Sequence, residues 1–120
     1  MAHGSRIAEA NDAAYQVAQM VRELTGFGIV EVAFQEKHQP DLQSGIDSCI
    51  EKGADRILLM PYFLCMGAHV RHDLPKQIAA AQKRYPELIM EMGGHLGVHR
   101  KLAEIEAERI GEALEELGWS

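Results

Sequence analysis

The sequence has little of what marks proteins outside the ordinary globular class. Its 120 residues include only two cysteines, Cys49 and Cys65, too few for a disulfide scaffold. No apolar run reaches the roughly 18 residues of a transmembrane helix, and the longest, residues 57–66, is interrupted by Pro61. No apolar segment of a secretory signal follows Met1. We therefore expect a cytoplasmic protein with reduced thiols and no membrane role.

Basic residues are also scarce. The chain has 12 Lys and Arg against 18 Asp and Glu, a formal net charge of −6, so it lacks the overall basic character of a nucleic-acid-binding protein. Neither G-x-G-x-x-G nor G-x-x-x-x-G-K-[ST] is present, which counts against dinucleotides and nucleoside triphosphates, and we expect no organic cofactor. With 47% hydrophobic and 25% charged residues and no linker, residues 1–120 are predicted to form one globular domain.

Hydrophobic periodicity predicts helices alternating with short strands. Four segments have apolar residues at helical spacing: 11–24, 41–53, 73–85 and 100–117. We expect Asn11 or Asp12 to cap the first helix and Asp73 to cap the third. Three short segments rich in apolar residues are predicted strands: 29–34, 57–60 and 88–92.

This order predicts an α/β domain of three layers, with a parallel sheet of flavodoxin-like type. The loops that follow strands then meet at one edge of the sheet, where such folds bind ligands. These loops are residues 35–39, 62–72 and 93–99, and they contain every histidine except His3. Only Met1 and Ala2 precede His3, so the first strand is expected to be missing, which leaves open edges in the sheet and lowers stability.

Three residues at this edge have the chemistry of a metal site. His3, Glu36 and His69 are separated by 33 and 33 residues, about the length of one strand-helix unit, so the topology brings them to the same edge. Two imidazoles and a carboxylate bind divalent first-row metals and leave coordination positions open. Each residue taken alone is better explained as a solvated loop side chain. For the three together, a metal site and three unrelated loop residues are both open.

Several motifs carry a resemblance to a known family. They are residues 3–6 (HGSR), 34–36 (FQE), the long stretch 61–75 (PYFLCMGAHVRHDLP) and 96–97 (LG). Together they resemble the short, single-domain class II tetrapyrrole chelatases of the sirohydrochlorin chelatase (CbiX) type. The stretch 61–75 is the specific one, since HGSR alone is a weak signal.

The resemblance implies insertion of a divalent metal into sirohydrochlorin, on the routes to cobalamin or sirohaem. Co²⁺ is favoured, with Fe²⁺ or Ni²⁺ as alternatives, and the metal is a substrate. It also implies that His3, Glu36 and His69 are the metal-binding and catalytic residues. This chemistry suits them, because two pyrrole protons must leave and neutral imidazole or carboxylate can accept them.

Other residues are assigned to the substrate or to packing. Sirohydrochlorin carries several carboxylates, so an acidic protein needs local cations, and Arg6, Arg71 and His72 flank the predicted ligands. Phe63 and Leu64 are predicted to form an apolar wall for the macrocycle. Less weight falls on five others: Cys65 and Met66 as packing or wall residues, His95 as a pocket residue, His99 at the start of the last helix, and His38 as accessory.

Two further expectations complete the sequence interpretation. The rival function is a non-catalytic metal carrier or sensor with the same histidines, because flavodoxin-like folds serve many functions. A flat macrocycle needs cover on both faces, and longer family members contain two such domains. The resemblance therefore implies a homodimer with facing sites, with Phe63 and Leu64 as candidate contact residues.

Overall fold

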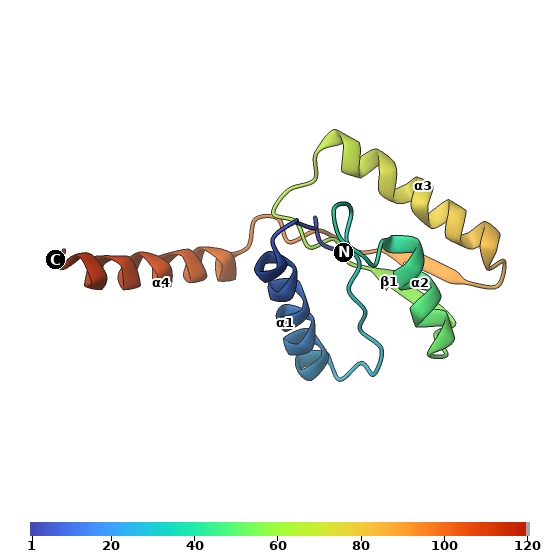
Figure 1. The fold of residues 1–120 in the computed structure, drawn as a ribbon, viewed down its shortest axis with the longest axis horizontal. Helices are drawn as coiled ribbons and strands as arrows, with labels where there is room; N and C mark the ends of the chain where they lie inside the picture. Colours follow the sequence, from blue (N-terminus) through green and yellow to red (C-terminus); the bar gives the residue numbers. More distant parts are fainter. Residues whose placement is uncertain (120) are drawn as a thin grey trace.

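Helices alternate with short strands along residues 1–119, which the computed structural model describes (Figure 1). The elements in chain order are α1 (Ala8–Thr25), α2 (Leu42–Glu51), β1 (Arg56–Leu59), α3 (Ala68–Arg84), β2 (Ile89–Met92) and α4 (Arg100–Leu117). The predicted α/β class is confirmed, and α4 has the predicted bounds. None of the described helices is both long and apolar enough to cross a membrane.

The sheet is small and parallel. Strand β1 pairs with β2, with Arg56 opposite Ile89 and Leu59 opposite Met92. On the other side of β1 lies the start of the chain: the Met1 amino group donates to the Met60 carbonyl at 3.1 Å, and the Tyr62 N–H donates to the Met1 carbonyl at 2.7 Å. Burial lowers the pKa of the Met1 amino group. Residues 1–3 therefore lie at the position in the sheet where the sequence predicted that a strand is missing.

Residues 29–34 differ from the prediction. They form no strand, and their parallel pairing is limited to an isolated bridge between Phe34 and Ala2. The Ala2 N–H donates to the Ala33 carbonyl at 2.9 Å, and the Gln35 N–H donates to the Ala2 carbonyl at 2.8 Å. A segment forms strand hydrogen bonds only where a partner strand lies beside it. Residues 1–3 lie beside only the last residues of the segment 29–34, so its earlier residues have no partner among them and form no strand.

The hydrophobic core lies between the sheet and the layer of α2 and α3. Leu59 and Met90 point from the sheet into this core and meet Ile46 of α2 and Leu74 of α3. Leu74 and Ala81 are both fully buried. The periodic apolar face of α3 also includes Val70, one turn before Leu74. This extra turn explains why α3 begins at Ala68, whereas the predicted cap, Asp73, lies inside the helix.

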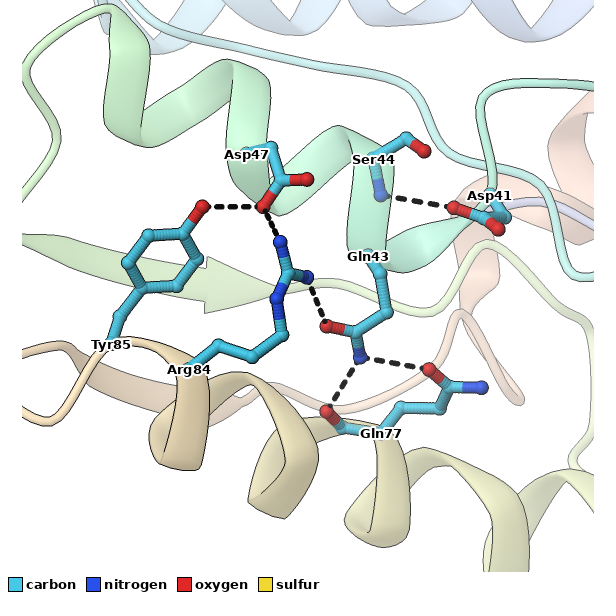
Figure 2. A network of polar contacts seen from close by, with 7 residues as sticks. All are labelled: Asp41, Gln43, Ser44, Asp47, Gln77, Arg84 and Tyr85. Carbon is cyan, nitrogen blue, oxygen red and sulfur yellow. Dashed lines mark hydrogen bonds and ion pairs between the residues drawn. The ribbon is translucent and has the colours of Figure 1, made fainter.

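Polar contacts join α2 to α3 above this core (Figure 2). One oxygen of Asp47 accepts from Arg84 and from the Tyr85 hydroxyl, each at 2.5 Å. The hydrogen bond to Asp47 raises the pKa of Tyr85. Gln43 donates to the backbone carbonyl and the side chain of Gln77, each at 2.9 Å. This layer is therefore held by both apolar packing and specific polar pairs.

The Asp41 side chain caps α2 as an N-cap. It accepts from the Ser44 N–H at 2.9 Å, and this hydrogen bond lowers the pKa of the Asp41 carboxyl. The helix predicted over 11–24 is present as α1, but its predicted cap is wrong: Ile7 is the N-cap, and Asn11 lies inside the helix, where it is buried. Asn11 instead exchanges two hydrogen bonds with the Ser5 backbone, at 2.9 and 2.8 Å. These bonds fix the turn that follows His3.

The other face of the sheet has little cover. Leu58, Met60 and Ile89 are 62%, 48% and 58% exposed on this side. Helix α4 runs away from the body instead of lying over them (Figure 1). The projecting helix makes the molecule elongated, 59 × 32 × 28 Å.

Candidate functional site at the carboxyl edge of the sheet

His3 lies at the carboxyl edge of the sheet, directly beside the segment that carries Glu36. The Glu36 N–H donates to the His3 carbonyl at 3.0 Å. Gly4 makes this approach possible: its φ is +90°, and a Cβ at this position would stand 1.8 Å from the Glu36 carbonyl oxygen. Only glycine combines this backbone conformation with this contact. Gly4 is thus a positioning residue that the sequence interpretation did not assign, although it follows a candidate ligand.

The His3 ring is held by two neighbours. Its centroid is 4.1 Å from that of Phe63, and Nδ1 is 3.2 Å from Gln35 Oε1. An amide oxygen only accepts, so Nδ1 is the donor in this contact. The other ring nitrogen, Nε2, is not engaged by Gln35.

Glu36 is accessible. Its side chain is 59% exposed and lies 3.6 Å from Lys37 Nζ. Close by, the His38 ring packs edge-on against the buried Phe34, with ring centroids 5.0 Å apart. The Glu36 carboxylate is thus free to turn toward a ligand at the cost of one exposed ion pair, worth about 0–1 kcal/mol.

His69 and His72 lie in the first turns of α3. The prediction that they lie in a loop was wrong. Both side chains are exposed. Arg71 follows His69 on the helix, and its Nε donates to the Met66 carbonyl at 3.0 Å, tying α3 to the loop before it. A helical position is more rigid than a loop position, so the backbone of His69 is fixed by α3.

Phe63 and Leu64 have different environments. Phe63 is buried, at 3% exposure, and its ring packs against the His3 ring. Its predicted role as an intersubunit contact is wrong, because its side chain is already covered within the chain. Leu64 is 66% exposed and remains available to a flat substrate.

The residues of lower weight are also placed. Met66 packs against the core, Cys65 is an exposed free thiol, and His95 is half-buried. His99 starts α4 as predicted, because its Nδ1 accepts from the Lys101 N–H at 3.0 Å. The Leu96 N–H donates to the Phe63 carbonyl at 3.0 Å, so the loop with His95 adjoins the segment beneath His3.

A hollow of about 280 Å³ lies beside His3. It is lined by His3, Gly4 and Ser5, by Tyr62, and by small residues of α1. Arg6 follows on the same turn and is exposed. Tyr62 was not assigned from the sequence, since nothing in its spacing distinguishes it from its neighbours.

The structure joins part of the predicted metal set. His3 and Glu36 are adjacent through their backbones, and His69 lies after the next strand at the same edge of the fold. Within residues 1–119, however, no three His, Cys, Asp or Glu side chains converge on a single ion. An α/β domain with a small parallel sheet, and with an accessible histidine and carboxylate at the carboxyl edge where such folds bind ligands, is the class of protein that this geometry defines.

Comparison with known proteins gives the family. The sequence model of the CbiX family matches residues 1–113. The chain belongs to the CbiX family.

Curated relatives support this membership. The chain is 36% identical over 110 residues to a sirohydrochlorin ferrochelatase of Priestia megaterium, covering 92% of this chain and 41% of the relative. It is 35% identical over 112 residues to a sirohydrochlorin cobaltochelatase of Sulfurisphaera tokodaii, covering 93% of this chain and 88% of the relative. The chain thus spans about half the length of some relatives and nearly all of others.

Solved structures share the fold. The sirohydrochlorin chelatase SirB from Bacillus subtilis subspecies spizizenii, in complex with cobalt, superposes with a TM-score of 0.85 at 28% identity, over 92% of this chain and 47% of SirB. A CbiX protein of Marinobacter aquaeolei VT8 matches with a TM-score of 0.78 at 23% identity, over 96% of this chain and 93% of that one. The latter supports the fold alone.

Proposed function

We propose that this chain is a chelatase that inserts a divalent metal into sirohydrochlorin. The observation that supports the proposal is the His3 ring: it lies beside the Glu36 segment, its Nε2 is not engaged by Gln35, and it falls within the residues that the CbiX family model matches. Relatives named for iron insertion and for cobalt insertion have similar identity to this chain, so they do not distinguish the metals. The proposal keeps Co²⁺ as the favoured metal, as the family resemblance implies, with Fe²⁺ and Ni²⁺ as alternatives.

The reaction exchanges one metal ion for two protons. As M²⁺ forms bonds to the macrocycle nitrogens, two pyrrole N–H bonds break and their protons must leave. His3 Nε2 and the Glu36 carboxylate are the groups on this edge that can accept them. His69 is the second imidazole that presents the metal, and closure of its side chain toward His3 would complete the ligand set. No organic cofactor enters this balance.

The substrate is held by charge and by apolar contact. Arg6, Arg71 and His72 are exposed around the edge and suit the carboxylates of sirohydrochlorin. Leu64 offers an exposed apolar surface for the macrocycle, and the buried Phe63 packs against the His3 ring. A second copy that covers the other face of the macrocycle makes the chain a homodimer. The cytoplasmic location and the absence of nucleic-acid and membrane partners stay predictions.

The absorbance spectrum of sirohydrochlorin, followed with Co²⁺ and with Fe²⁺, tests the proposal. The wild-type chain is expected to convert the spectrum to that of the metallated product. His69→Ala should lower the rate about 100-fold or more without changing the fold, because the side chain is exposed. Lys76→Ala, an exposed substitution two turns further along α3, is the matched control and should not change the rate.

The competing function gives a different result. A metal carrier or sensor would bind Co²⁺ in equilibrium dialysis, but the tetrapyrrole spectrum would change no faster than in the absence of protein. Glu36→Gln keeps the size of the side chain and removes its charge, so it should slow insertion if Glu36 accepts a proton or binds the metal. An unchanged rate in Glu36→Gln removes this residue from the mechanism, and an unchanged rate in His69→Ala removes His69.

A further inference from the structure

Gln35 contacts the segment of His3 twice. Its backbone N–H donates to the Ala2 carbonyl at 2.8 Å, and its side-chain Oε1 lies 3.2 Å from His3 Nδ1. The backbone of Gln35 is itself held, because the preceding Phe34 is 1% exposed and its N–H donates to the Pro40 carbonyl at 2.8 Å. The half-buried Gln35 side chain therefore extends from a fixed backbone position beside the imidazole.

The bond to Gln35 does what the packing on Phe63 does not do. The His3 and Phe63 rings are tilted by 46° with their centroids 4.1 Å apart. A half-turn of the imidazole about its Cβ–Cγ bond leaves the ring in the same plane, so this contact accepts both orientations of the ring. The half-turn exchanges Nδ1 with a carbon, which cannot replace it as a donor to Gln35 Oε1. The bond therefore selects one orientation and places the donated proton on Nδ1.

A second histidine shows the opposite arrangement. His99 Nδ1 accepts from the Lys101 N–H at 3.0 Å, so in the neutral ring of His99 the proton is on Nε2. In His3 the partner of Nδ1 is an acceptor, so in the neutral ring the lone pair is on Nε2. The two rings thus differ in the nitrogen that a metal can bind, and His99 has already used its lone pair as a helix cap.

We propose that Gln35 is the positioning residue of the metal site, whose amide oxygen holds the His3 proton on Nδ1 and fixes the ring so that Nε2 is presented to the metal. This role rests on the proposed function. Gln35 itself contacts neither the metal nor the macrocycle and acts through His3 alone. A histidine that is already in the binding tautomer needs no rearrangement before it takes the metal.

A neutral partner suits a metal that must be passed on. A carboxylate at this position would form a charge-assisted hydrogen bond and make the imidazole a more basic, more retentive ligand. An amide oxygen fixes the same tautomer and orientation without adding a charge. Gln35 therefore orients His3 without strengthening its hold on Co²⁺ as a carboxylate would.

Nitrogen-15 NMR of the imidazole rings, without metal or sirohydrochlorin, tests this role independently of activity. At alkaline pH, where free imidazole is neutral, the shifts of the two ring nitrogens show which of them carries the proton. The His3 signal is assigned by its absence from the His3→Gln spectrum. We expect the Nδ1–H form for His3 and the Nε2–H form for His99, which is the internal control. A His3 proton on Nε2 overturns the proposal.

Two substitutions separate the hydrogen bond from packing. Gln35→Met has about the same length but only a weakly accepting sulfur, whereas Gln35→Glu keeps an oxygen acceptor. The Nδ1–H form of His3 should persist in Gln35→Glu and be lost in Gln35→Met. Gln82→Met, the same change at an exposed position of α3, is the matched control and should leave the His3 signal unchanged. A wild-type tautomer in Gln35→Met shows that Gln35 only packs and overturns the proposal.

Co²⁺ binding connects the tautomer with the metal site. Gln35→Met, with its fold confirmed by circular dichroism, should bind Co²⁺ about 10–100-fold more weakly in equilibrium dialysis, the usual loss when the partner of a ligating histidine is removed. Its kcat for metal insertion should fall while the KM for sirohydrochlorin stays the same, because Gln35 does not contact the macrocycle. Unchanged Co²⁺ affinity overturns the proposal. The wild-type NMR result requires no change at Gln35, so it decides the question even where Gln35→Met does not fold.

Failure of the proposed function has a different signature. A wild-type chain that holds His3 in the Nδ1–H form and loses Co²⁺ affinity on Gln35→Met, but does not metallate sirohydrochlorin, contradicts the chelatase function and supports the role of Gln35. A chain that metallates sirohydrochlorin equally well with Gln35 and with Gln35→Met supports the function and overturns that role.

Discussion

One face of the β1–β2 sheet packs against α2 and α3, whereas the opposite face exposes Leu58, Met60 and Ile89. The covered face has a fully buried Leu74 and the polar pairs around Asp47. On the open face Leu58, Met60 and Ile89 stay exposed, and α4 does not lie over them. The covered face stabilises the domain, whereas the open face leaves its apolar side chains in contact with solvent. Substitutions on the two faces should therefore have different consequences.

The largest expected difference is between two leucines. Leu74→Ala removes a fully buried side chain and should lower the free energy of unfolding by about 2–5 kcal/mol. Leu58→Ala alters a side chain that is 62% exposed in the single chain and should change the stability of the monomer by less than about 1 kcal/mol. Urea unfolding at low protein concentration measures both. Equal losses would show that the two faces do not differ.

A smaller difference is expected between two acidic residues. Asp47→Ala removes hydrogen bonds from both Arg84 and Tyr85 and should cost about 1–2 kcal/mol after allowance for solvent exposure. Glu104→Ala on α4 breaks an exposed pair with Arg100 and should cost about 0.5 kcal/mol or less. The same unfolding assay compares them, and a larger cost on α4 would reverse the assignment.

The layer of α2 and α3 should also weaken at high pH. The pKa of Tyr85 is raised by its bond to Asp47, so its contribution is complete below the pKa of the unfolded tyrosine, about 10, and is lost as the pH rises through the folded value. Tyr85→Phe should remove this part of the pH dependence. Thermal unfolding between neutral and alkaline pH tests it, and an identical pH dependence in the variant would contradict the assignment.

A modest effect is expected at the cap of α2. Asp41→Ala should destabilise the chain by about 1 kcal/mol near neutral pH, because Ser44 N–H loses its acceptor. The lowered pKa of Asp41 means that its contribution is present above about pH 4 and is lost as the pH falls through the folded value. The difference between wild type and variant should therefore shrink in acid. A difference that stays constant would show that the charge of Asp41 is irrelevant.

The sequence predicted elements whose signals are local. The bounds of α4, 100–117, follow from helical spacing, and the same spacing predicted the second helix from residue 41, one residue before its observed start. The start of α3 was missed because Val70 continues the apolar stripe of Leu74 past loop-like residues. The absence of a strand at residues 29–34 depends on the length of its partner, which no local pattern contains.

The site was predictable in part for the same reason. Topology places His3 and Glu36 at one edge, and their backbones are indeed bonded. The tilted contact of the His3 ring with Phe63 and the close approach at Gly4 depend on how three separate segments meet, so the spacing of these residues in the sequence did not reveal them. The outward course of α4 likewise depends on the Leu96 to Phe63 bond.

The most direct test of the account is the rate at which the purified chain inserts Co²⁺ into sirohydrochlorin, compared with that of His3→Gln. Glutamine is about as long as histidine and can still pack on Phe63, but it lacks the imidazole nitrogen that binds metal and accepts a proton. The account predicts that the wild-type chain metallates the macrocycle and that His3→Gln, folded and equally stable, does so about 100-fold or more slowly. Equal rates in the two proteins would contradict the assignment of the carboxyl edge as the site of metal insertion.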